Sequence, residues 1–345
     1  MPKQYTRIMR AICSRPWAIM PDKLDEILAF IEAKQAGMTI DPAIVAQIQA
    51  AAPQQRVSGA VAVLPLFGVI SQRMNLMTEI SGGTSTEKFV KQYRVFIEDP
   101  GIKALVLDVA SPGGEAFGVE EASAQMFAMR GRKKVVAVSN SMMASAAYYL
   151  ASAADEVVVS PSSLTGAIGT FSVHTELSKM NEKLGITKTM IKSGKFKGEG
   201  NDFEPLTEEA FAAMQSIIDN YDDMFIKSMA RNRGLPLATV RKGFGEGRIL
   251  TAKEAVKAGL ADRVATMDET IARLVGRSGT TAVSAQIDLD HELTDPEIAA
   301  LLNLSALSPE DVVGISPVVK ALAAITEGSD AWRTELEREK FELGL

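Results

Sequence analysis

The apolar positions along the chain form two kinds of pattern. Short runs rich in β-branched residues, such as Lys134-Val-Val-Ala-Val138, predict buried strands. Longer stretches with apolar residues three and four positions apart predict amphipathic helices. The expected strands lie at residues 61–70, 102–109, 134–138, 156–160, 170–174 and 188–192. The expected helices lie at residues 21–34, 42–52, 86–98, 119–130, 176–184, 207–232 and 251–262.

The order of these elements predicts an α/β fold. From about residue 102, strands alternate with helices at the spacing of βαβ units. We expect three parts: an N-terminal helical extension at residues 1–55, a main domain at 56–275, and a linker with a C-terminal segment at 276–345. The helices of the extension are expected to pack on the main domain or on a neighbouring subunit.

The last segment differs from the rest in charge. Residues 286–345 hold 13 Asp and Glu against 4 Lys and Arg, whereas the whole chain has a formal charge of −6. Apolar helical patches occur at residues 296–302 and 318–325. We therefore expect an acidic interaction segment, and a solvated tail without function is the alternative.

Composition excludes several classes of protein. An acidic chain argues against nucleic-acid binding, which usually requires a basic face. The single cysteine, Cys13, excludes an internal disulfide, and with two histidines the chain is too poor in ligands for a typical zinc site. No run approaches the roughly 18 apolar residues of a membrane span or forms a signal-peptide core. We expect a soluble cytoplasmic protein without a membrane anchor.

Candidate chemistry begins where the strand at 134–138 leads into the Ala- and Tyr-rich stretch at 139–155, which predicts a helix. Free backbone N–H groups at such a junction suit a developing oxyanion. Ser145 is the candidate nucleophile because its neighbours are small alanines. Ser141 is the rival, although we expect it to cap the helix. A third interpretation is that Ala and Ser here only permit close helix packing.

A nucleophilic serine requires a base. The two histidines are poorly placed, because His291 lies in the acidic tail and His174 follows a predicted strand where a structural role is commoner. A lysine can serve if burial lowers its pKa from about 10.4 towards about 7. Lys195 and Lys197 lie in a glycine-flanked loop that can fold over another element, and a solvent-facing role remains open for both.

The turn Ser111-Pro-Gly-Gly114 follows another predicted strand. Glycines at this position let backbone N–H groups face a ligand. A plain tight turn is the alternative.

Five ordered motifs resemble the signal peptide peptidase A family, and in particular its bacteriophage head-maturation protease branch. The likeness covers about residues 56–270. The motifs are Asp108-Val-Ala-Ser-Pro-Gly-Gly114, Ala144-Ser-Ala-Ala-Tyr-Tyr-Leu-Ala-Ser-Ala-Ala-Asp155, Leu164-Thr-Gly-Ala-Ile-Gly169, Ser193-Gly-Lys-Phe-Lys197 and Ala252-Lys-Glu-Ala-Val-Lys-Ala-Gly-Leu-Ala-Asp262.

The resemblance implies a Clp-protease/crotonase-like fold of repeated ββα units and a serine-lysine dyad without a cofactor. Ser145 matches the family's nucleophile and Lys197 its general base, whereas Lys195 has no match. The implied oxyanion donors are the backbone N–H groups of Gly113, Gly114 and Ala146.

One position departs from the family's pattern. Membrane-anchored relatives have a serine after Thr-Gly that helps orient the lysine, and this chain has Ala167 there. Thr165, Ser193 or a water molecule could take over that role. The lack of an anchor and the acidic tail both resemble the phage branch.

The resemblance therefore implies a serine endopeptidase that cleaves scaffold and capsid proteins, and itself, in assembling phage heads in the host cytoplasm. It also implies a homo-oligomeric ring. Three alternatives remain open: a cytosolic peptidase for signal peptides or protein fragments, a catalytically silent scaffolding protein of the same fold, and a crotonase-type acyl-thioester enzyme.

Overall fold

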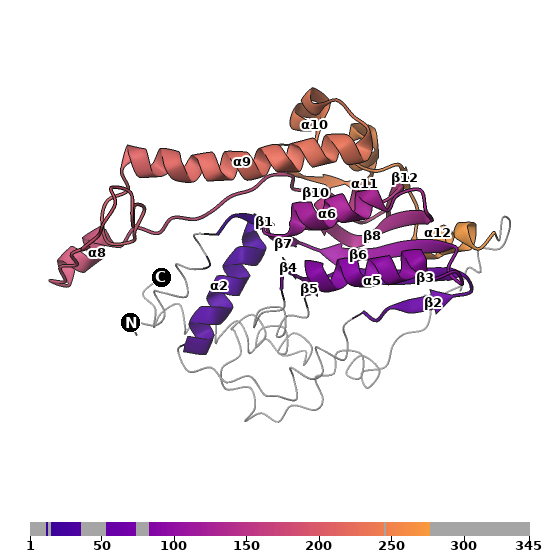
Figure 1. Ribbon diagram of the computed structural model, residues 1–345, viewed down its shortest axis with the longest axis horizontal. Helices are drawn as coiled ribbons and strands as arrows, with labels where there is room; N and C mark the ends of the chain where they lie inside the picture. The colour runs from indigo at the N-terminus through magenta and orange to yellow at the C-terminus, as the bar shows by residue number, and fades with distance from the viewer. Residues whose placement is uncertain (1–11, 13–14, 36–52, 74–82, 245, 277–345) are drawn as a thin grey trace, which may run out of the picture. The chain divides into compact units, whose positions relative to one another are not determined.

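A parallel sheet built around one long strand forms the centre of the chain. The computed structural model describes residues 12, 15–35, 53–73, 83–244 and 246–276 (Figure 1). Strand β8 (Lys134–Ala144) pairs in parallel with β6 (Ala104–Ser111) on one side and with β9 (Glu156–Val159) and then β10 (Leu164–Gly166) on the other. Strand β3 (Val61–Phe67) continues the parallel sheet beyond β6. Its outer members are β2 (Arg56–Ser58), β11 (Ile249–Thr251) and β12 (Arg263–Val264).

A second, smaller sheet lies at the ends of these strands. Its order is β1 (Trp17–Ile19), β7 (Gly113–Glu115), β4 (Ile70–Ser71) and β5 (Thr84–Ser85). The chain passes from β3 into β4 and from β6 into β7 before entering α5 (Thr86–Glu98) and α6 (Val119–Ala128), respectively. This repeated strand–strand–helix order confirms the predicted α/β class and its ββα units.

The central strands are apolar at almost every position because both faces of the sheet are covered. Neighbouring residues on β6 show this: Leu107 belongs to the core on the side of α5, α6 and α7 (Ala146–Ala151), whereas Val106 belongs to a second core beneath α12 (Met267–Leu274). Both side chains are fully buried. The period-two alternation of a strand thus fills two cores from one run of sequence.

The remaining helices surround this framework. They are α2 (Pro21–Gln35), α8 (Ser178–Lys183), α9 (Glu208–Arg233), α10 (Leu237–Gly243) and α11 (Ala252–Ala258). Helix α9 begins where the Thr207 hydroxyl accepts the Ala210 N–H and ends at Gly234 in the left-handed region. Figure 1 shows α9 above α6, and the segment around α8 projecting past the N-terminal end of α9.

Several local predictions are wrong. Ser141 does not cap a helix, because β8 continues to Ala144 and α7 begins only at Ala146. Residues 188–192 form no strand, and at 170–174 only Phe171 makes an isolated bridge. The pattern failed at 188–192 because Ile191 is 98% exposed and this segment pairs with no strand among the described residues.

Other predictions lie outside the described residues: the helix at 42–52, the linker and the acidic segment beyond residue 276. The domain boundaries stay predictions. No helix within the described ranges is both long and apolar enough to cross a membrane.

Candidate active site

Ser145 occupies a sharp turn between β8 and α7. Its backbone angles are φ 54° and ψ −118°, a left-handed conformation that is uncommon for residues other than glycine. The Ser145 N–H donates to the Gly166 carbonyl oxygen at 2.7 Å, and the Ser145 carbonyl oxygen accepts the Tyr149 N–H at 2.9 Å. These two hydrogen bonds hold the backbone in its strained conformation, and such strain is common at functional sites.

The hydroxyl of Ser145 has no hydrogen-bond partner among the described residues, although the residue is only 1% exposed. A buried hydroxyl without a partner destabilises the fold by about 1–3 kcal/mol. Strain and an unsatisfied polar group thus coincide at one residue. This combination is poor for stability and suits a group reserved for a reacting partner.

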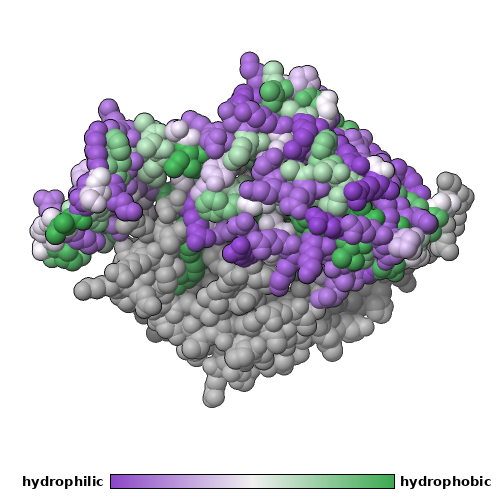
Figure 2. Space-filling model, viewed as in Figure 1, coloured by the Kyte–Doolittle hydropathy of each residue, from purple (hydrophilic) through white to green (hydrophobic). Residues whose placement is uncertain are grey.

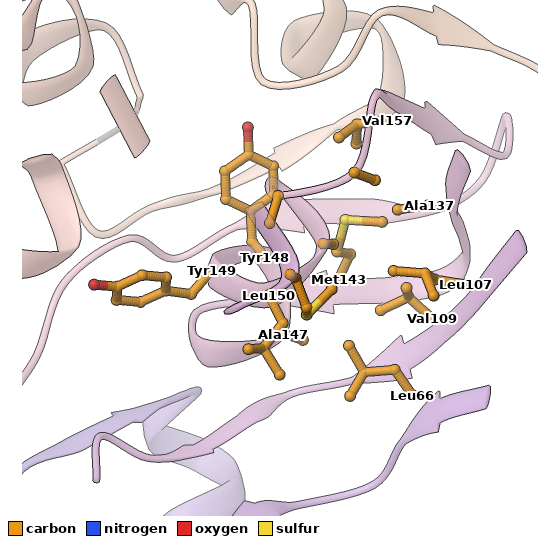
Figure 3. Close-up of a cluster of buried hydrophobic side chains, with 14 of the residues drawn as sticks. Leu66, Leu107, Val109, Ala137, Met143, Ala147, Tyr148, Tyr149, Leu150 and Val157 are labelled. Carbon is orange, nitrogen blue, oxygen red and sulfur yellow. The ribbon is translucent and has the colours of Figure 1, made fainter. Parts of the chain in front are cut away.

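Helix α7, which follows Ser145, is packed into the hydrophobic core, and Figure 3 shows Tyr148 and Tyr149 of this helix among the buried side chains. The Tyr148 hydroxyl donates to the Leu260 carbonyl oxygen at 2.8 Å, and the ring of Tyr149 stacks on Phe225 with centroids 4.3 Å apart. Burial raises the pKa of both tyrosines, so both phenols stay neutral. Ala146 is the first residue of α7, and the first N–H groups of a helix have no partner within it.

The Gly113–Gly114 turn lies against Ser145. A Cβ atom built on Gly113, whose φ is +100°, would lie 3.0 Å from the Ser145 Cβ, and one on Gly114 would lie 1.8 Å from the Ile70 carbonyl oxygen. Neither position has room for a side chain. The Gly113 N–H donates to Ser111 Oγ at 3.2 Å, which leaves the Gly114 N–H as the better candidate donor.

Lys197 does not meet Ser145 within the chain. Its side chain is exposed and forms no ion pair or hydrogen bond with any described residue. Lys195, by contrast, pairs with Glu209 at 2.9 Å and lies over the Phe196 ring. The structure therefore brings together Ser145, Gly113, Gly114 and Ala146 but leaves the predicted base apart.

The other polar candidates are distributed as follows. His174 Nε2 is buried and lacks a hydrogen-bond partner among the described residues, so it does not bond Ser145. The Thr165 hydroxyl is also buried without a described partner, whereas Ser193 is exposed. Ala167 has φ 52° and offers no hydroxyl. No group of three His, Cys, Asp or Glu side chains in the described part could hold a metal ion.

One part of this region was not predicted from the sequence. Strand β1 pairs antiparallel with β7, the strand that carries Gly113 and Gly114. Three residues are too few to show a strand period, and their partners lie almost a hundred positions away. The only available signal was the apolar triplet Trp17-Ala18-Ile19 between Pro16 and Pro21.

Comparisons with known proteins agree with the motifs. Residues 128–279 match Peptidase family S49. The chain is 32% identical over 216 residues to the head-tail preconnector protein GP5 of Enterobacteria phage P21, an alignment that covers 63% of this chain and 43% of the relative. It is 30% identical over 216 residues to the capsid assembly protease C of Escherichia phage lambda, covering 63% of this chain and 49% of the relative.

The chain thus spans about half the length of the phage relatives it matches. Among solved structures, a mutant of ClpP1 from Listeria monocytogenes aligns with a TM-score of 0.37 at 14% identity, covering 60% of this chain and 92% of that chain. The family match and the two phage relatives confirm the resemblance that the five motifs predict.

Proposed function

We propose that this chain, whose residues 128–279 match Peptidase family S49, is a serine endopeptidase with Ser145 as nucleophile and Lys197 as general base. The observation that carries the proposal is the state of Ser145: a left-handed backbone and a buried hydroxyl without a described partner, beside two glycines that admit no side chain. A serine that only helped helices to pack would need neither the strain nor the unpaired hydroxyl.

The proposed reaction proceeds in two halves. Neutral Lys197 accepts the Ser145 proton while the serine oxygen bonds to the substrate's carbonyl carbon, and the N–H groups of Gly114 and Ala146 stabilise the resulting oxyanion. The tetrahedral intermediate collapses, the peptide C–N bond breaks, and Lys197 donates its proton to the leaving amine. Water then attacks the acyl-enzyme with the same lysine as base, which releases the acid and restores Ser145.

Because Lys197 lies apart from Ser145, we infer that a second copy of the chain supplies it. Lys197 belongs to the projecting segment 173–197, which exposes an unusual number of large apolar side chains (Figure 2). They are Val173, Met180, Leu184, Ile186, Ile191 and Phe196. Exposed apolar clusters of this kind mark interaction surfaces. Docking would remove the lysine from water, and this favours its neutral form.

Repetition of this contact around a closed set of subunits would give the ring expected from the sequence. A contact between two different surfaces of identical chains closes into a ring when the rotation between neighbours permits it. In such a ring each site would combine Ser145 of one subunit with Lys197 of the next.

The setting we propose is phage head assembly in the host cytoplasm, with scaffold and capsid polypeptides, and the chain itself, as substrates. Its support is the pair of phage relatives and the order of the five motifs. One observation favours a second candidate, a catalytically silent scaffolding protein, because Ala167 lacks the hydroxyl that orients the lysine in relatives. The buried Thr165 hydroxyl is available for that role and supports the enzyme instead.

Covalent labelling tests the proposal. A fluorophosphonate probe should modify the wild-type chain at Ser145, located by peptide mass mapping, and should not modify Ser145→Ala. Ser139→Ala is the matched control, because Ser139 is equally buried but has an ordinary strand backbone. Failure to label Ser145 under assembly conditions would exclude the peptidase and favour the silent scaffold or an acyl-thioester enzyme.

A further inference from the structure

Strand β1 occupies a gap between two backbone edges next to Ser145. On one side Ile19 lies opposite Gly113 and Ala18 opposite Gly114, in antiparallel register. On the other side the Trp17 N–H donates to the Phe171 carbonyl oxygen at 2.8 Å, and the Phe171 N–H donates to the Trp17 carbonyl oxygen at 3.0 Å. A three-residue segment of the chain is thus held as an extended strand between β7 and residue 171.

This strand places a peptide carbonyl at the predicted oxyanion donor. The residue pairs on either side of this three-residue ladder are hydrogen-bonded. The Met20 N–H donates to the Pro112 carbonyl oxygen at 2.9 Å, and the Ala116 N–H donates to the Pro16 carbonyl oxygen at 3.1 Å. Hydrogen-bonded pairs alternate along an antiparallel ladder, so Ala18 and Gly114 form the hydrogen-bonded pair between them. The Gly114 N–H therefore faces the Ala18 carbonyl.

The same carbonyl lies close to the nucleophile. A Cβ atom built on Gly113 would lie 2.2 Å from the Ala18 carbonyl oxygen, 3.0 Å from the Ile19 Cα and 3.0 Å from the Ser145 Cβ. Ser145 and the peptide bond between Ala18 and Ile19 thus lie against one glycine. Trp17, Ala18 and Ile19 are each at most 3% exposed.

We propose that β1 is an internal pseudosubstrate: it occupies the strand position of a substrate peptide and must leave before another extended peptide can reach Ser145. This inference rests on the proposed function. Addition of a strand to exposed backbone edges is a general mode of peptide recognition, in which the backbone supplies affinity and alternate side chains supply specificity. The ion pair between Arg15 and Glu115, at 2.6 Å, fastens the strand at its start.

The fit of β1 also indicates which substrates displace it. Ala18 lines a cavity of about 120 Å³ together with Ala116, Val119, Tyr149 and Phe225. A methyl group leaves most of this space empty. A peptide with leucine at the corresponding position would fill it and bind about tenfold more tightly than one with alanine. This advantage lets a free peptide compete with a tethered strand, whose effective concentration is on the order of millimolar.

A reversible covalent lock tests the proposal in the full chain. Trp17 and Glu115 face each other in a non-hydrogen-bonded pair, where two cysteines can form a disulfide. The test variant combines Trp17→Cys and Glu115→Cys with Cys13→Ser, which removes the native cysteine. The matched control carries only Trp17→Cys and Cys13→Ser, so it cannot form the disulfide. In the Ser145→Ala background, binding of fluorescein-labelled Arg-Pro-Trp-Leu-Ile-Met is followed by anisotropy.

The reduced test variant should bind this peptide about tenfold more tightly than it binds the same peptide with alanine in place of leucine. Oxidation should abolish peptide binding by the test variant. Oxidation should not change peptide binding by the control. Equal peptide binding in both redox states would overturn the pseudosubstrate. With Ser145 intact, oxidation should slow fluorophosphonate labelling at least tenfold. If peptide binding depends on the redox state but Ser145 is never labelled, the proposed peptidase activity is wrong, whereas the proposal that β1 occupies the peptide-binding position is supported.

Discussion

The N–H of Ser145 donates to the carbonyl oxygen of Gly166 at 2.7 Å, which ties the start of α7 to the end of β10. Gly166 has φ +126°, a conformation that L side chains rarely adopt. The left-handed turn at Ser145 therefore depends on a glycine on the neighbouring strand.

Replacement of that glycine tests the dependence. In Gly166→Ala the new Cβ would lie 2.9 Å from the Arg248 carbonyl oxygen and the backbone would be strained. We expect a loss of about 1–3 kcal/mol in the free energy of unfolding, measured with urea, and slower labelling of Ser145. Gly243→Ala on α10 is the control, since its Cβ would meet only Thr239 at 3.9 Å. A Gly166→Ala protein as stable and as reactive as wild type would contradict this account of the turn.

Ser145 itself should reduce stability. Ser145→Gly relieves the positive φ and removes the buried hydroxyl, so we expect the free energy of unfolding to rise by about 1–2 kcal/mol while labelling is lost. Ser145→Ala should gain less, because alanine keeps the strain. Ser139→Ala removes a buried unpaired hydroxyl from an unstrained strand and separates the two effects. If Ser145→Gly is less stable than Ser145→Ala, the backbone strain is absent.

Thr165 should position the base. Thr165→Val keeps the shape and removes a hydroxyl that has no described partner, so stability should stay within about 1 kcal/mol. Substrate cleavage should fall about tenfold to a hundredfold, and its pH profile should move to higher pH because the neutral amine is less favoured. Thr165→Ser should restore activity, and Ser193→Ala should leave it unchanged. Wild-type kinetics for Thr165→Val would assign the role to another group.

Glu156 should make stability depend on acidity. Burial opposes its ionisation, but hydrogen bonds from Arg273 and Arg263, and the charge of Arg273, outweigh it and lower the pKa from 4.5 to about 2. A carboxylate with a lowered pKa stabilises the fold above its unfolded pKa, and that stability is lost as pH falls from about 4.5 towards 2.

Urea unfolding between pH 2 and pH 7 measures this effect. We expect wild type to lose about 1–2 kcal/mol over that window through Glu156, and Glu156→Gln to show a flatter profile. Glu182→Gln, at an exposed position on α8, serves as the control. If Glu156→Gln loses as much unfolding free energy at low pH as wild type does, other carboxylates cause most of the acid destabilisation.

Elements that are determined by local sequence patterns could be predicted from the sequence, whereas elements that depend on contacts between distant residues could not. The runs at β3, β6, β8 and β9 were predictable because covered parallel strands are apolar at nearly every position. The end of β8 was missed because Ser139, Asn140 and Ser141 interrupt the apolar pattern while the strand continues. The position of β1 depends on pairing with residues 113–115, and no local pattern encodes such a contact.

The candidate site divides in the same way. Ser145, Gly113, Gly114 and Ala146 were identified from the residues and the family motifs, and the fold brings them together. The glycine-flanked loop indicated both Lys195 and Lys197, and only a family motif selected Lys197, which stays apart from Ser145 within the chain. The proposed contact between subunits depends on a surface, the exposed apolar side chains of residues 173–197, that only a structure shows.

Intact mass measured over time, with the scaffold or capsid polypeptide that we propose as substrate, tests the dyad most directly. Four samples are compared: wild type, Ser145→Ala, Lys197→Ala, and an equimolar mixture of the two variants. We predict that wild type processes itself or its partner, that each variant alone leaves every mass unchanged, and that the mixture regains part of the activity by pairing an intact Ser145 with an intact Lys197 from different copies. Processing by either single variant at the wild-type rate would contradict the dyad.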